Sequence, residues 1–544
     1  MPNTQNSPIR IAMAQNNFLV GDIQGNTDLI IQAAREAAAG GARLIVFTEL
    51  ALTGYPPEDL LLRSSLQLRV EAALQRIADA SSDIAIAVGY PWRENGKLYN
   101  CAGIWWAGKQ VAHYAKQHLP NYQVFDEERY FCAGDQACVI ELFGHKLALT
   151  VCEDVWFPGP VEKAAAAGAE LILNLNASPF HIGKQTERVT RLQNHARAHG
   201  IPLIYVNQVG GQDELVFDGA SFAVSGNGDT VLQMPAYATS QGMVDWDGSQ
   251  LRALSESHEA HESRLASLYQ ALVVGVRDYV NKNRFPGVIL GLSGGIDSAL
   301  TLAVAVDALG AERVKAVMMP FTYTSGMSRE DAAEQAETMG VRYRSISIEP
   351  MYREFMAALA PEFDGLAADT TEENLQSRCR GVLLMAMSNK TGDMVLTTGN
   401  KSEMAVGYAT LYGDMAGGYG ALKDVYKTNV FALAEYRNSL SPVIPQRVID
   451  RPPSAELAPD QVDEDSLPPY PVLDAILESY IEQDMSAEAI IAAGYEREDV
   501  MRVVRLVDIN EYKRRQAPIG VRVTPRGFGR DRRYPVTNGW KAGI

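Results

Sequence analysis

Short apolar runs alternate with longer helical stretches along most of the chain, and this alternation restricts the fold more than any other feature of the sequence. In the first half, helical patterns over residues 27–39 and 162–167 separate several of these runs. Strands that alternate with helices are typical of α/β domains with buried central strands. We therefore predict an α/β fold in both halves. The strand-like runs cover residues 9–15, 42–50, 83–90, 146–154, 169–178 and 202–210 in the first half and 287–295, 313–321, 343–349 and 393–400 in the second.

A polar segment over residues 245–265 separates the two halves. It carries many charges and few apolar side chains, which is typical of a linker or a surface helix. At about 150 residues per domain, a chain of 544 residues has room for two large domains. We predict a first domain over residues 1–250, a linker over 251–264 and a second domain over 265–544.

Two segments of the second half are acidic or rich in proline and show no periodicity. They cover residues 364–374 and 450–470. Long loops in compact domains usually carry function. We therefore predict that these two segments are loops over an active site.

Charge and composition argue against several classes of protein. With 49 basic and 66 acidic residues the net charge is −17, which does not suit a wholesale nucleic-acid-binding surface. No apolar run is long enough for a transmembrane helix, and the polar N-terminus is unlike a secretory signal. The five cysteines form no CxxC pair, which argues against a zinc cage or a disulfide framework. We expect a cytoplasmic protein without nucleic-acid or membrane partners.

A glycine-rich loop, GLSGGIDS, joins an apolar strand to a helix that starts at about Asp297. Its glycines allow an anion close to the backbone, and the free N–H groups of the helix start point at that anion. A Walker loop would carry a lysine here, and none is present. SGGIDS resembles the loop of ATP pyrophosphatases, which cleave ATP between the α- and β-phosphates. The loop comprises Gly291, Leu292, Ser293, Gly294, Gly295, Ile296, Asp297 and Ser298.

Acidic side chains near this loop predict a metal ion. An aspartate beside phosphates is unfavourable unless a cation lies between them, so we predict that Asp297 is a Mg²⁺ ligand. A second strand-to-helix turn, LTTGNKSE, offers Thr398 to ATP and Glu403 to the metal. A glutamate at a helix start is more commonly a capping residue, and that alternative stays open for Glu403. Lys427 and Ser454 follow as a candidate cation and a candidate hydroxyl for the phosphates.

Three candidate catalytic residues of the first half each come at or just after the end of a strand-like run. They are Glu49, Lys116 and Cys152. In sheet proteins the carboxyl ends of strands gather catalytic groups. A cysteine thiolate can attack an amide carbon, and a glutamate can accept the thiol proton. A lysine and a backbone N–H, here that of Glu153, can stabilise the tetrahedral oxyanion.

The segments FTELALTGYPPEDL, YAKQHLPNYQVFDEERYF and TVCEDVWFPGP resemble the nitrilase superfamily of carbon–nitrogen hydrolases. This resemblance covers roughly residues 8–245 and implies an α-β-β-α sandwich with a catalytic set of Glu49, Lys116 and Cys152. It also implies that the amide is the side chain of glutamine. The resemblance further assigns Tyr122, Ser178 and Lys184 to glutamine binding and Glu128 and Glu153 to supporting carboxylates.

In the second half TTEENLQSRCRG, MSNKTGDMVLTTGNKSEMAVGYATLYGDMAGG, KDVYKT and EYKRRQAP resemble glutamine-dependent NAD synthetases. The resemblance covers residues 265–540 and implies a doubly wound parallel sheet of the adenine nucleotide alpha hydrolase type. It assigns residues 291–298, Thr398, Lys427 and Ser454 to ATP and Asp297 and Glu403 to Mg²⁺. It assigns Asn374, Glu403 and Lys513, with Arg378 or Arg380, to the second substrate, nicotinic acid adenine dinucleotide (deamido-NAD).

The C-terminal stretch 513–533 carries eight basic residues and one acidic residue. Such a stretch by itself suggests a nucleic-acid patch. It has few aromatic residues and belongs to an acidic chain, so we favour a pocket for the phosphates and the carboxylate of a dinucleotide.

Together the two resemblances imply an amide-forming ligase. ATP would activate the nicotinate carboxylate of deamido-NAD as an acyl-adenylate, and ammonia released from glutamine would reach it by an internal passage. We expect a homo-oligomer, because members of this family associate. Two alternatives stay open: an amidase fused to an ATP pyrophosphatase acting on tRNA or GMP precursors, and a module that binds dinucleotide without catalysis.

Overall fold

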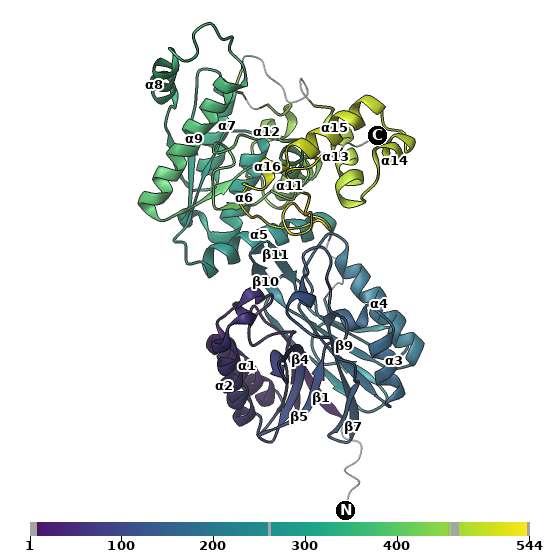
Figure 1. The fold of residues 1–544 in the computed structure, drawn as a ribbon. Helices are drawn as coiled ribbons and strands as arrows, with labels where there is room; N and C mark the ends of the chain where they lie inside the picture. The colour runs from purple at the N-terminus through teal and green to yellow at the C-terminus, as the bar shows by residue number, and fades with distance from the viewer. Residues whose placement is uncertain (1–7, 259–262, 455, 459–466, 541–544) are drawn as a thin grey trace, which may run out of the picture. The chain divides into compact units, whose positions relative to one another are not determined.

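The computed structural model describes residues 8–258, 263–454, 456–458 and 467–540. The chain divides into two compact units, Met1–Arg264 and Leu265–Ile544 (Figure 1). Each unit contains β-sheet flanked by helices, so the predicted α/β class is confirmed.

The first unit contains two large sheets and a hairpin. The seven-stranded sheet has the order β15-β14-β1-β2-β3-β4-β5, and the six-stranded sheet has the order β13-β12-β9-β8-β7-β6. In both, the central strands run parallel and the outer strands run antiparallel. The strands are β1 Ile9–Gln15, β2 Leu44–Val46, β3 Ala85–Glu94, β4 Lys97–Trp106, β5 Lys109–Ala115, β6 Cys138–Leu142, β7 His145–Val151, β8 Leu171–Asn176, β9 Leu203–Asn207, β10 Val209–Gln212, β11 Leu215–Asp218, β12 Phe222–Val224, β13 Thr230–Gln233, β14 Ser240–Trp246 and β15 Leu251–Ala253.

Alternation along these strands explains how the layers stack. In β1, Ile11 and Met13 join a core shared with Leu147 and Leu149 of the other sheet, whereas Ala12 faces the helices. Side chains of a strand point to opposite faces in turn, so a strand that is apolar throughout must be covered on both sides. The helices α1 Ile23–Ala39 and α2 Ser64–Ala80 cover the first sheet, and α3 Gly159–Ala166 and α4 Lys184–His199 cover the second. The predicted α-β-β-α sandwich is therefore confirmed.

The last strand of this unit lies inside the segment that we predicted to be a linker. Leu251 pairs with Trp246 and is buried, and β15 extends the seven-stranded sheet at the edge of β14. The prediction that residues 251–264 are all linker is therefore wrong at its start. Only three residues form this strand, too few for an alternating pattern to show in the sequence.

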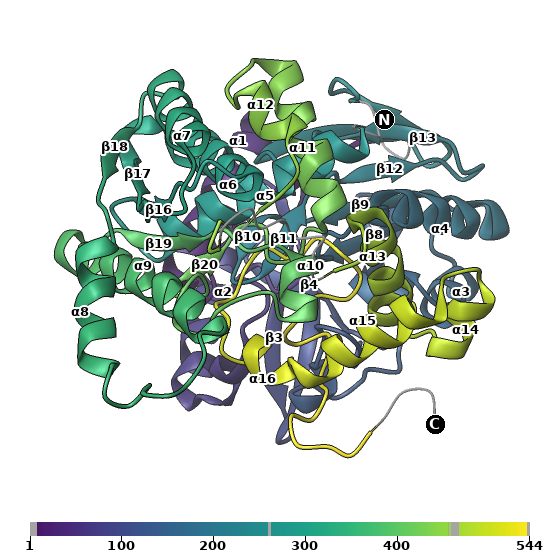
Figure 2. The same ribbon diagram turned by 90° about the horizontal axis from the view of Figure 1, so that it is seen from above.

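The second unit is built on a five-stranded sheet with the order β18-β17-β16-β19-β20, in which all pairs are parallel. Figure 2 shows α6 and α7 on one side of the sheet and α8 and α9 on the other, as in a doubly wound fold. The strands are β16 Val288–Gly291, β17 Val314–Met318, β18 Arg342–Ser345, β19 Met394–Thr397 and β20 Tyr419–Gly420. The helices are α5 Arg264–Lys282, α6 Ile296–Leu309, α7 Gly326–Thr338, α8 Glu349–Leu359, α9 Thr370–Thr391, α10 Lys401–Val406, α11 Lys427–Leu440 and α12 Gln446–Asp450.

The strand order of this sheet reverses between β16 and β19. The chain first builds outward from β16 to β17 and β18, and then returns to add β19 on the other side. In open parallel sheets, ligands bind in the crevice at such a topological switch point. The glycine-rich loop follows β16 and the Thr398 turn follows β19, so both predicted ATP segments flank this point.

A helical subdomain completes the second unit. Its own core is formed by residues such as Leu473, Ile476 and Val503. The helices are α13 Tyr470–Leu477, the π-helical turn η7 Glu478–Glu482, α14 Ala487–Ala492, α15 Arg497–Ile509 and α16 Glu511–Arg514.

The first of the two predicted loops is partly helical. Helix α9 begins at Thr370 with a capping box between Asp369 and Glu372, so residues 370–374 are helix. The sequence shows little periodicity there because α9 buries few of its side chains. Of the second predicted loop, 450–470, residues 455 and 459–466 lie outside the described residues.

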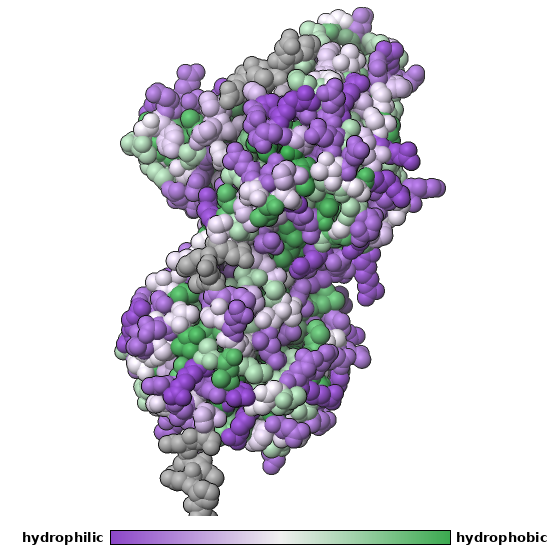
Figure 3. All heavy atoms as spheres, turned by 180° about the vertical axis from the view of Figure 1, so that it is seen from behind, coloured by the Kyte–Doolittle hydropathy of each residue, from purple (hydrophilic) through white to green (hydrophobic). Residues whose placement is uncertain are grey.

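The surface view in Figure 3 shows hydrophobic residues interspersed with hydrophilic ones on the face drawn. Within the described ranges, we find no helix with the length and apolar character needed to cross a membrane. All five cysteines are free thiols.

Candidate active sites

The ends of three strands bring the predicted catalytic residues of the first unit together. Lys116 directly follows β5, Cys152 directly follows β7, and Glu49 lies shortly after β2. The Nζ atom of Lys116 donates a hydrogen bond of 2.7 Å to Oε1 of Glu49, although 67 residues separate them. The charges of both side chains also act on the pKa of Cys152. The fold thus gathers residues that no sequence spacing links.

A second carboxylate, which the sequence analysis did not identify, completes the lysine site. Lys116 Nζ donates to both carboxylate oxygens of Glu127, at 2.9 Å each, and Tyr55 donates to Oε1 of Glu127 at 2.8 Å. The predicted supporting residue Glu128 is exposed and accepts a bond from Asn121. The assignment of Glu128 is therefore wrong by one position, because the turn η3 Glu127–Arg129 points only its first side chain inward.

The carboxylate of Glu49 is fixed on both oxygens. Oε1 accepts a bond of 2.7 Å from the Asn100 amide in addition to that from Lys116, and Oε2 accepts one of 3.1 Å from the backbone N–H of Ala177. The side chain is fully buried. A buried carboxylate held in this way keeps one orientation, as a general base requires.

Cys152 lies on a sharp turn at the end of β7. Its φ is +43°, in the left-handed region that non-glycine residues seldom occupy, and it opens the 3-10 turn η4 Cys152–Val155. Strained backbone of this kind persists only where surrounding contacts hold it. Here the contacts come from Asp154, whose Oδ2 accepts from the N–H of Val151 at 2.9 Å and from the Tyr114 hydroxyl at 2.8 Å.

Asp154 also connects the turn that carries Cys152 to the segment that carries Lys116. Its Oδ1 accepts from the backbone N–H groups of Gln117 at 3.0 Å and His118 at 2.9 Å, which directly follow Lys116. One buried carboxylate therefore holds the turn that carries Cys152 and the segment that carries Lys116. No local pattern in the sequence marks this role.

The charges around Cys152 determine how readily its thiol loses a proton. Burial raises the pKa of the Cys152 thiol, Glu49 raises it further, and Lys116 lowers it. For Lys116, burial acts to lower the pKa, but Glu127 and Glu49 outweigh it and the pKa is raised well above its usual value. The lysine therefore stays charged, and the thiol needs a base to take its proton.

The residues predicted to bind glutamine surround this site. Tyr122 donates a bond of 2.6 Å to Glu153, which directly follows Cys152. Ser178 is buried, and its hydroxyl oxygen accepts a hydrogen bond of 3.2 Å from Nε of Arg188. Lys184 lies 3.7 Å from the ring centre of Trp156, and burial lowers its pKa.

Arg188 is a further buried side chain that the sequence analysis missed. It donates to the carbonyl oxygen of Ser178 at 2.7 Å and to both oxygens of Asp218 at 2.7 Å. A fully buried arginine is marked in sequence only by its place on α4, where it resembles any other polar helix residue.

In the second unit the glycine-rich loop is closed by its own serines. Ser298 Oγ accepts from the N–H of Ser293 at 3.2 Å, and Ser293 Oγ accepts from that of Gly295 at 3.1 Å. Gly294 has φ +81°, and a Cβ there would come within 2.3 Å of the Ser328 carbonyl oxygen. Only glycine fits at this position. Helix α6 begins at Ile296, one residue before the predicted start.

Asp297 and Glu403, the two predicted metal ligands, converge on one ammonium group. Lys427 Nζ donates to Oδ2 of Asp297 and, at 3.0 Å, to Oε1 of Glu403. Asn400 donates to the other oxygen of Asp297 at 2.8 Å. Glu403 also takes part in the capping box of α10, the commoner role that the sequence analysis left open for it.

The other predicted ATP residues lie on segments beside the loop. Thr398 directly follows β19 and is half-buried. Ser454 is exposed and accepts the N–H of Glu456 at 3.1 Å. Its segment reaches the glycine-rich loop through Arg451, which donates to the carbonyl oxygen of Gly294 and to Ser328 Oγ.

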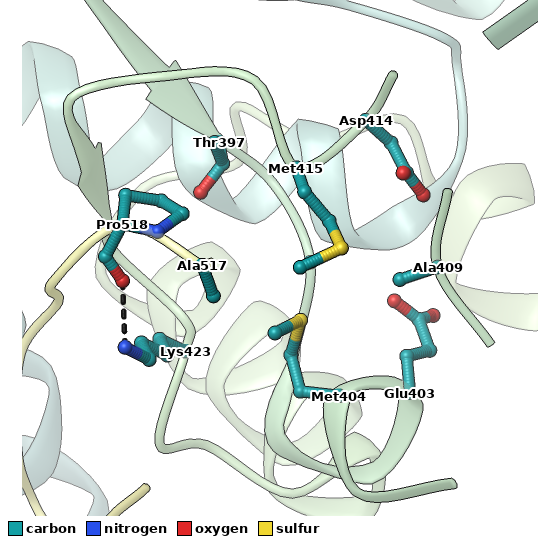
Figure 4. A pocket seen from close by; sticks show the side chains of 10 residues that line it. Thr397, Glu403, Met404, Ala409, Asp414, Met415, Lys423, Ala517 and Pro518 are labelled. Carbon is teal, nitrogen blue, oxygen red and sulfur yellow. Dashed lines mark hydrogen bonds between the residues drawn. The ribbon is translucent and has the colours of Figure 1, made fainter. Parts of the chain in front are cut away.

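A cavity lies beside Glu403. Met404 and Met415 face each other across it, and the carboxylates of Glu403 and Asp414 lie at one side (Figure 4). Lys423 closes it opposite them with a bond of 2.6 Å to the Pro518 carbonyl oxygen. The cavity is lined by Thr397, Gly399, Glu403, Met404, Ala409, Asp414, Met415, Lys423, Ala517 and Pro518.

Among the residues predicted to bind deamido-NAD, Glu403 lines this cavity. Lys513 donates to the carbonyl oxygens of Gly407 and Ala409, at 2.8 and 2.9 Å, and Asn374 accepts from the Thr410 hydroxyl at 2.8 Å. Lys513 and Asn374 therefore both contact the segment 407–410. One residue of this segment, Ala409, lines the cavity. Arg378 donates to the Leu411 carbonyl and Arg380 to that of Met319.

Several arginines of the basic stretch 513–533 form ion pairs within their own unit. Glu511 pairs with Arg514 and Arg532, and Arg522 pairs with Asp531. These contacts show why a run of basic residues in the sequence need not form a basic surface.

Comparison with known proteins finds a matching family for each of the two units. Residues 10–254 match the family model for carbon–nitrogen hydrolases, and residues 268–517 match that for NAD synthases. A glutamine-dependent NAD(+) synthetase of Acinetobacter baylyi is 51% identical over 98% of this chain and 99% of its own length. That of Thermotoga maritima is 42% identical over 98% and 99%.

Two solved structures have the same fold along the whole chain. That of the glutamine-dependent NAD+ synthetase from Acinetobacter baumannii in complex with adenosine diphosphate is 49% identical, with a TM-score of 0.81 over 99% of this chain and 100% of that one. The enzyme from Cytophaga hutchinsonii has a TM-score of 0.85 over 98% of each chain, at 22% identity.

Fold and site together define a carbon–nitrogen hydrolase domain that precedes an NAD synthase domain, as expected of an amide-forming ligase. The chain belongs to the family of glutamine-dependent NAD(+) synthetases. Both family resemblances inferred from the sequence motifs are thus confirmed.

Proposed function

We propose that this chain makes NAD⁺ from deamido-NAD and ATP, with glutamine as the nitrogen donor. ATP activates the nicotinate carboxylate as an acyl-adenylate with release of pyrophosphate, and ammonia displaces AMP. The observation that carries most weight is the buried Glu49–Lys116 pair at the Cys152 turn, because synthesis from free ammonium would not require it. The sequence left open an amidase fused to an ATP pyrophosphatase acting on tRNA or GMP precursors, and a module that binds dinucleotide without catalysis. The full-length match to glutamine-dependent NAD(+) synthetases favours neither of them.

In the first unit, Glu49 accepts the thiol proton of Cys152 and the thiolate attacks the side-chain amide of glutamine. The tetrahedral intermediate then collapses to a thioester as the C–N bond breaks, and Glu49 gives its proton to the leaving ammonia. Lys116, whose pKa is raised, stays charged and stabilises the oxyanion together with the N–H of Glu153. Loss of one such donor costs about 100- to 1000-fold in rate. Glu49 then activates the water that releases glutamate. Tyr122, Ser178 and Lys184 bind the glutamine.

In the second unit, the loop 291–298 binds ATP phosphates through backbone N–H groups at the start of α6. Thr398 and Ser454 add hydroxyl groups, and Lys427 adds a positive charge. The remaining candidates, Asn374, Glu403 and Lys513, bind deamido-NAD beside the cavity of Figure 4.

The residues of this site also fit a Mg²⁺ ion. Asp297 and Glu403 both contact the same ammonium group, so their oxygens already favour a positive charge at one point. Among the described residues no cluster of three metal-ligating side chains occurs. Mg²⁺ characteristically takes one or two carboxylates and completes its shell with substrate phosphates and water. When bound, the ion would neutralise phosphate charge.

Direct transfer of nitrogen explains why both activities are on one chain. At neutral pH free ammonia is mostly ammonium, which is not a nucleophile. Ammonia formed in an enclosed site and passed directly to the adenylate avoids protonation.

Amide-¹⁵N-labelled glutamine provides the test. We expect the label in the nicotinamide group of NAD⁺ by mass spectrometry. Cys152→Ala should abolish synthesis from glutamine but keep synthesis from high ammonium, and Cys138→Ala, a half-buried cysteine on β6, should keep both. Equal loss of both activities in folded Cys152→Ala would contradict the proposed division of roles.

A further inference from the structure

The position of Lys427 depends on where α11 begins, because Lys427 is the first residue of that helix. Its ammonium group meets Asp297 and Glu403, while its backbone N–H is one of the groups that a helix leaves unpaired. The preceding residue, Tyr426, makes no side-chain capping bond. The cap therefore comes from other parts of the chain.

Ser402 and Asp474 supply this cap. Ser402 Oγ accepts the N–H of Lys427 at 2.9 Å, and Asp474 Oδ2 accepts that of Thr428 at 2.8 Å. Ser402 in turn donates its hydroxyl to Oδ1 of Asp474. Ser402, Asp474 and Lys427 are all buried. Two side chains from α10 and α13 thus fix the first two residues of α11.

Helix α13 contacts both ends of Lys427. Tyr470 and Asp474 are four residues apart and so lie on one face of this helix. The ring centre of Tyr470 lies 5.2 Å from Lys427 Nζ, within the range of a cation–π contact. Asp474 holds the backbone end through Thr428 and Ser402. The neighbouring Leu473 and Leu477 anchor α13 in the helical core.

Ser402 and Asp474 also hold Glu403 in position. Ser402 precedes Glu403 on α10, so the bond from Ser402 to Asp474 holds the helix that carries this carboxylate. Asn400, which caps α10, donates to Asp297. The three charged groups Asp297, Glu403 and Lys427 are therefore connected through one buried junction of α10, α11 and α13.

We propose that Asp474, acting with Ser402, is a positioning residue that holds Lys427 against Asp297 and Glu403 and so sets the affinity of the synthetase site for ATP. This role rests on the proposed function of the second unit. Asp474 touches none of the reacting groups in this scheme and acts through Lys427. A misplacement of about 1 Å in a catalytic group costs on the order of 100-fold in rate.

Two variants test this role in the full-length protein. Asp474→Asn keeps the shape but cannot accept both bonds, and Ser402→Ala removes the acceptor for Lys427. With ammonium as donor, we expect kcat/KM for ATP to fall about 10- to 100-fold in each variant. The KM for glutamine, measured as hydrolysis in the first unit, should stay within twofold. ATP affinity by calorimetry should weaken in parallel.

Ser486→Ala is the matched control. Ser486 is an exposed serine that caps α14 in the same unit and accepts the N–H of Ala489 at 3.2 Å. We expect it to leave the KM for ATP unchanged. Thermal unfolding of all three variants fixes an assay temperature at which each is folded. If Asp474→Asn does not fold, Ser402→Ala decides.

An unchanged ATP affinity in Asp474→Asn or Ser402→Ala, or a KM for glutamine that rises as much as that for ATP, would overturn the positioning role. Failure of the wild-type protein to make NAD⁺ from ATP, deamido-NAD and ammonium would refute the proposed function instead. The calorimetric ATP affinities would then still decide the role of Asp474.

Discussion

Each candidate site contains a buried lysine held between two carboxylates, and the two arrangements differ in their access to solvent. In the first, the side chains of Lys116 and Glu49 are fully buried and that of Glu127 is 7% exposed. In the second, the side chain of Lys427 is 2% exposed, but those of Asp297 and Glu403 are 18% and 17% exposed.

This difference fits the task that we propose for each site. Both oxygens of Glu49 are satisfied by protein donors, so the first cluster is complete and rigid before glutamine binds. Electrostatic stabilisation is most effective when charged groups need no reorganisation during the reaction. The partly exposed carboxylates of the second cluster can exchange contacts with a charged substrate. A closed cluster suits proton transfer, and an open one suits binding of phosphates and metal.

Replacing each lysine by methionine gives the largest expected contrast. Lys116→Met leaves two buried carboxylates without their cation, which should cost about 3–5 kcal/mol of stability. Lys427→Met leaves carboxylates that water can reach, and about 1–2 kcal/mol is expected. Hydrogen exchange of the β5 and β7 amides and of the α6 and α11 amides measures each unit separately. Equal losses of stability in the two variants would contradict the difference between the closed and the open cluster.

The next largest effect concerns the pH dependence of stability at the closed cluster of Lys116, Glu49 and Glu127. Burial raises the pKa of Glu127 from 4.5 to about 7, although Lys116 opposes the shift. The folded state then binds this proton more tightly than the unfolded chain, so stability should fall as the pH rises between about 4.5 and 7.

In Glu127→Gln this decline should disappear, a change of up to about 1.4 kcal/mol per pH unit. Hydrogen exchange of the β7 amides at pH 5 to 8 measures it. Glu128→Gln is the matched control, because Glu128 is the exposed neighbour and should leave the slope unchanged. The same slope in wild type and Glu127→Gln would show that Glu127 does not titrate in this range.

The smallest effect concerns the edge of the closed site. Tyr122 is 48% exposed and donates to Glu153. Tyr122→Phe should raise the KM for glutamine about two- to tenfold with little change in kcat, as expected for one hydrogen bond. Tyr130→Phe, which removes a similar bond to Asp59, serves as control in the same steady-state assay. A fall in kcat with unchanged KM would show that Tyr122 acts on the reacting groups instead.

The sequence predicts the main strands of both units because they are long apolar runs covered on both sides. It also places Glu49, Lys116 and Cys152 near strand ends, which gather at one edge of a sheet. The resemblance to the nitrilase superfamily then predicts that these three residues are the catalytic set. Local pattern does not determine which acid of the run over residues 126–128 points inward, since one short turn decides it. This is why Glu127 was missed.

Local sequence patterns do not predict contacts between segments that lie far apart in the sequence. The roles of Asp154 and Asp474 depend on bonds to other strands and helices, and neither residue stands out among its neighbours in the sequence. Family resemblance predicts that Asn374 and Lys513 bind the substrate but does not predict their bonds to residues 407–410. Those bonds exist only after the chain has folded back on itself.

The short strand β15 has a practical consequence for separating the two activities. A chain cut after residue 250 would lose Leu251 and its neighbours and would expose the backbone of Val244–Trp246 at the border of the sheet. Unpaired strand borders recruit other chains and cause aggregation. An isolated glutaminase is therefore best obtained by extending the fragment past Ala253, so that the sheet keeps its protective outer strand.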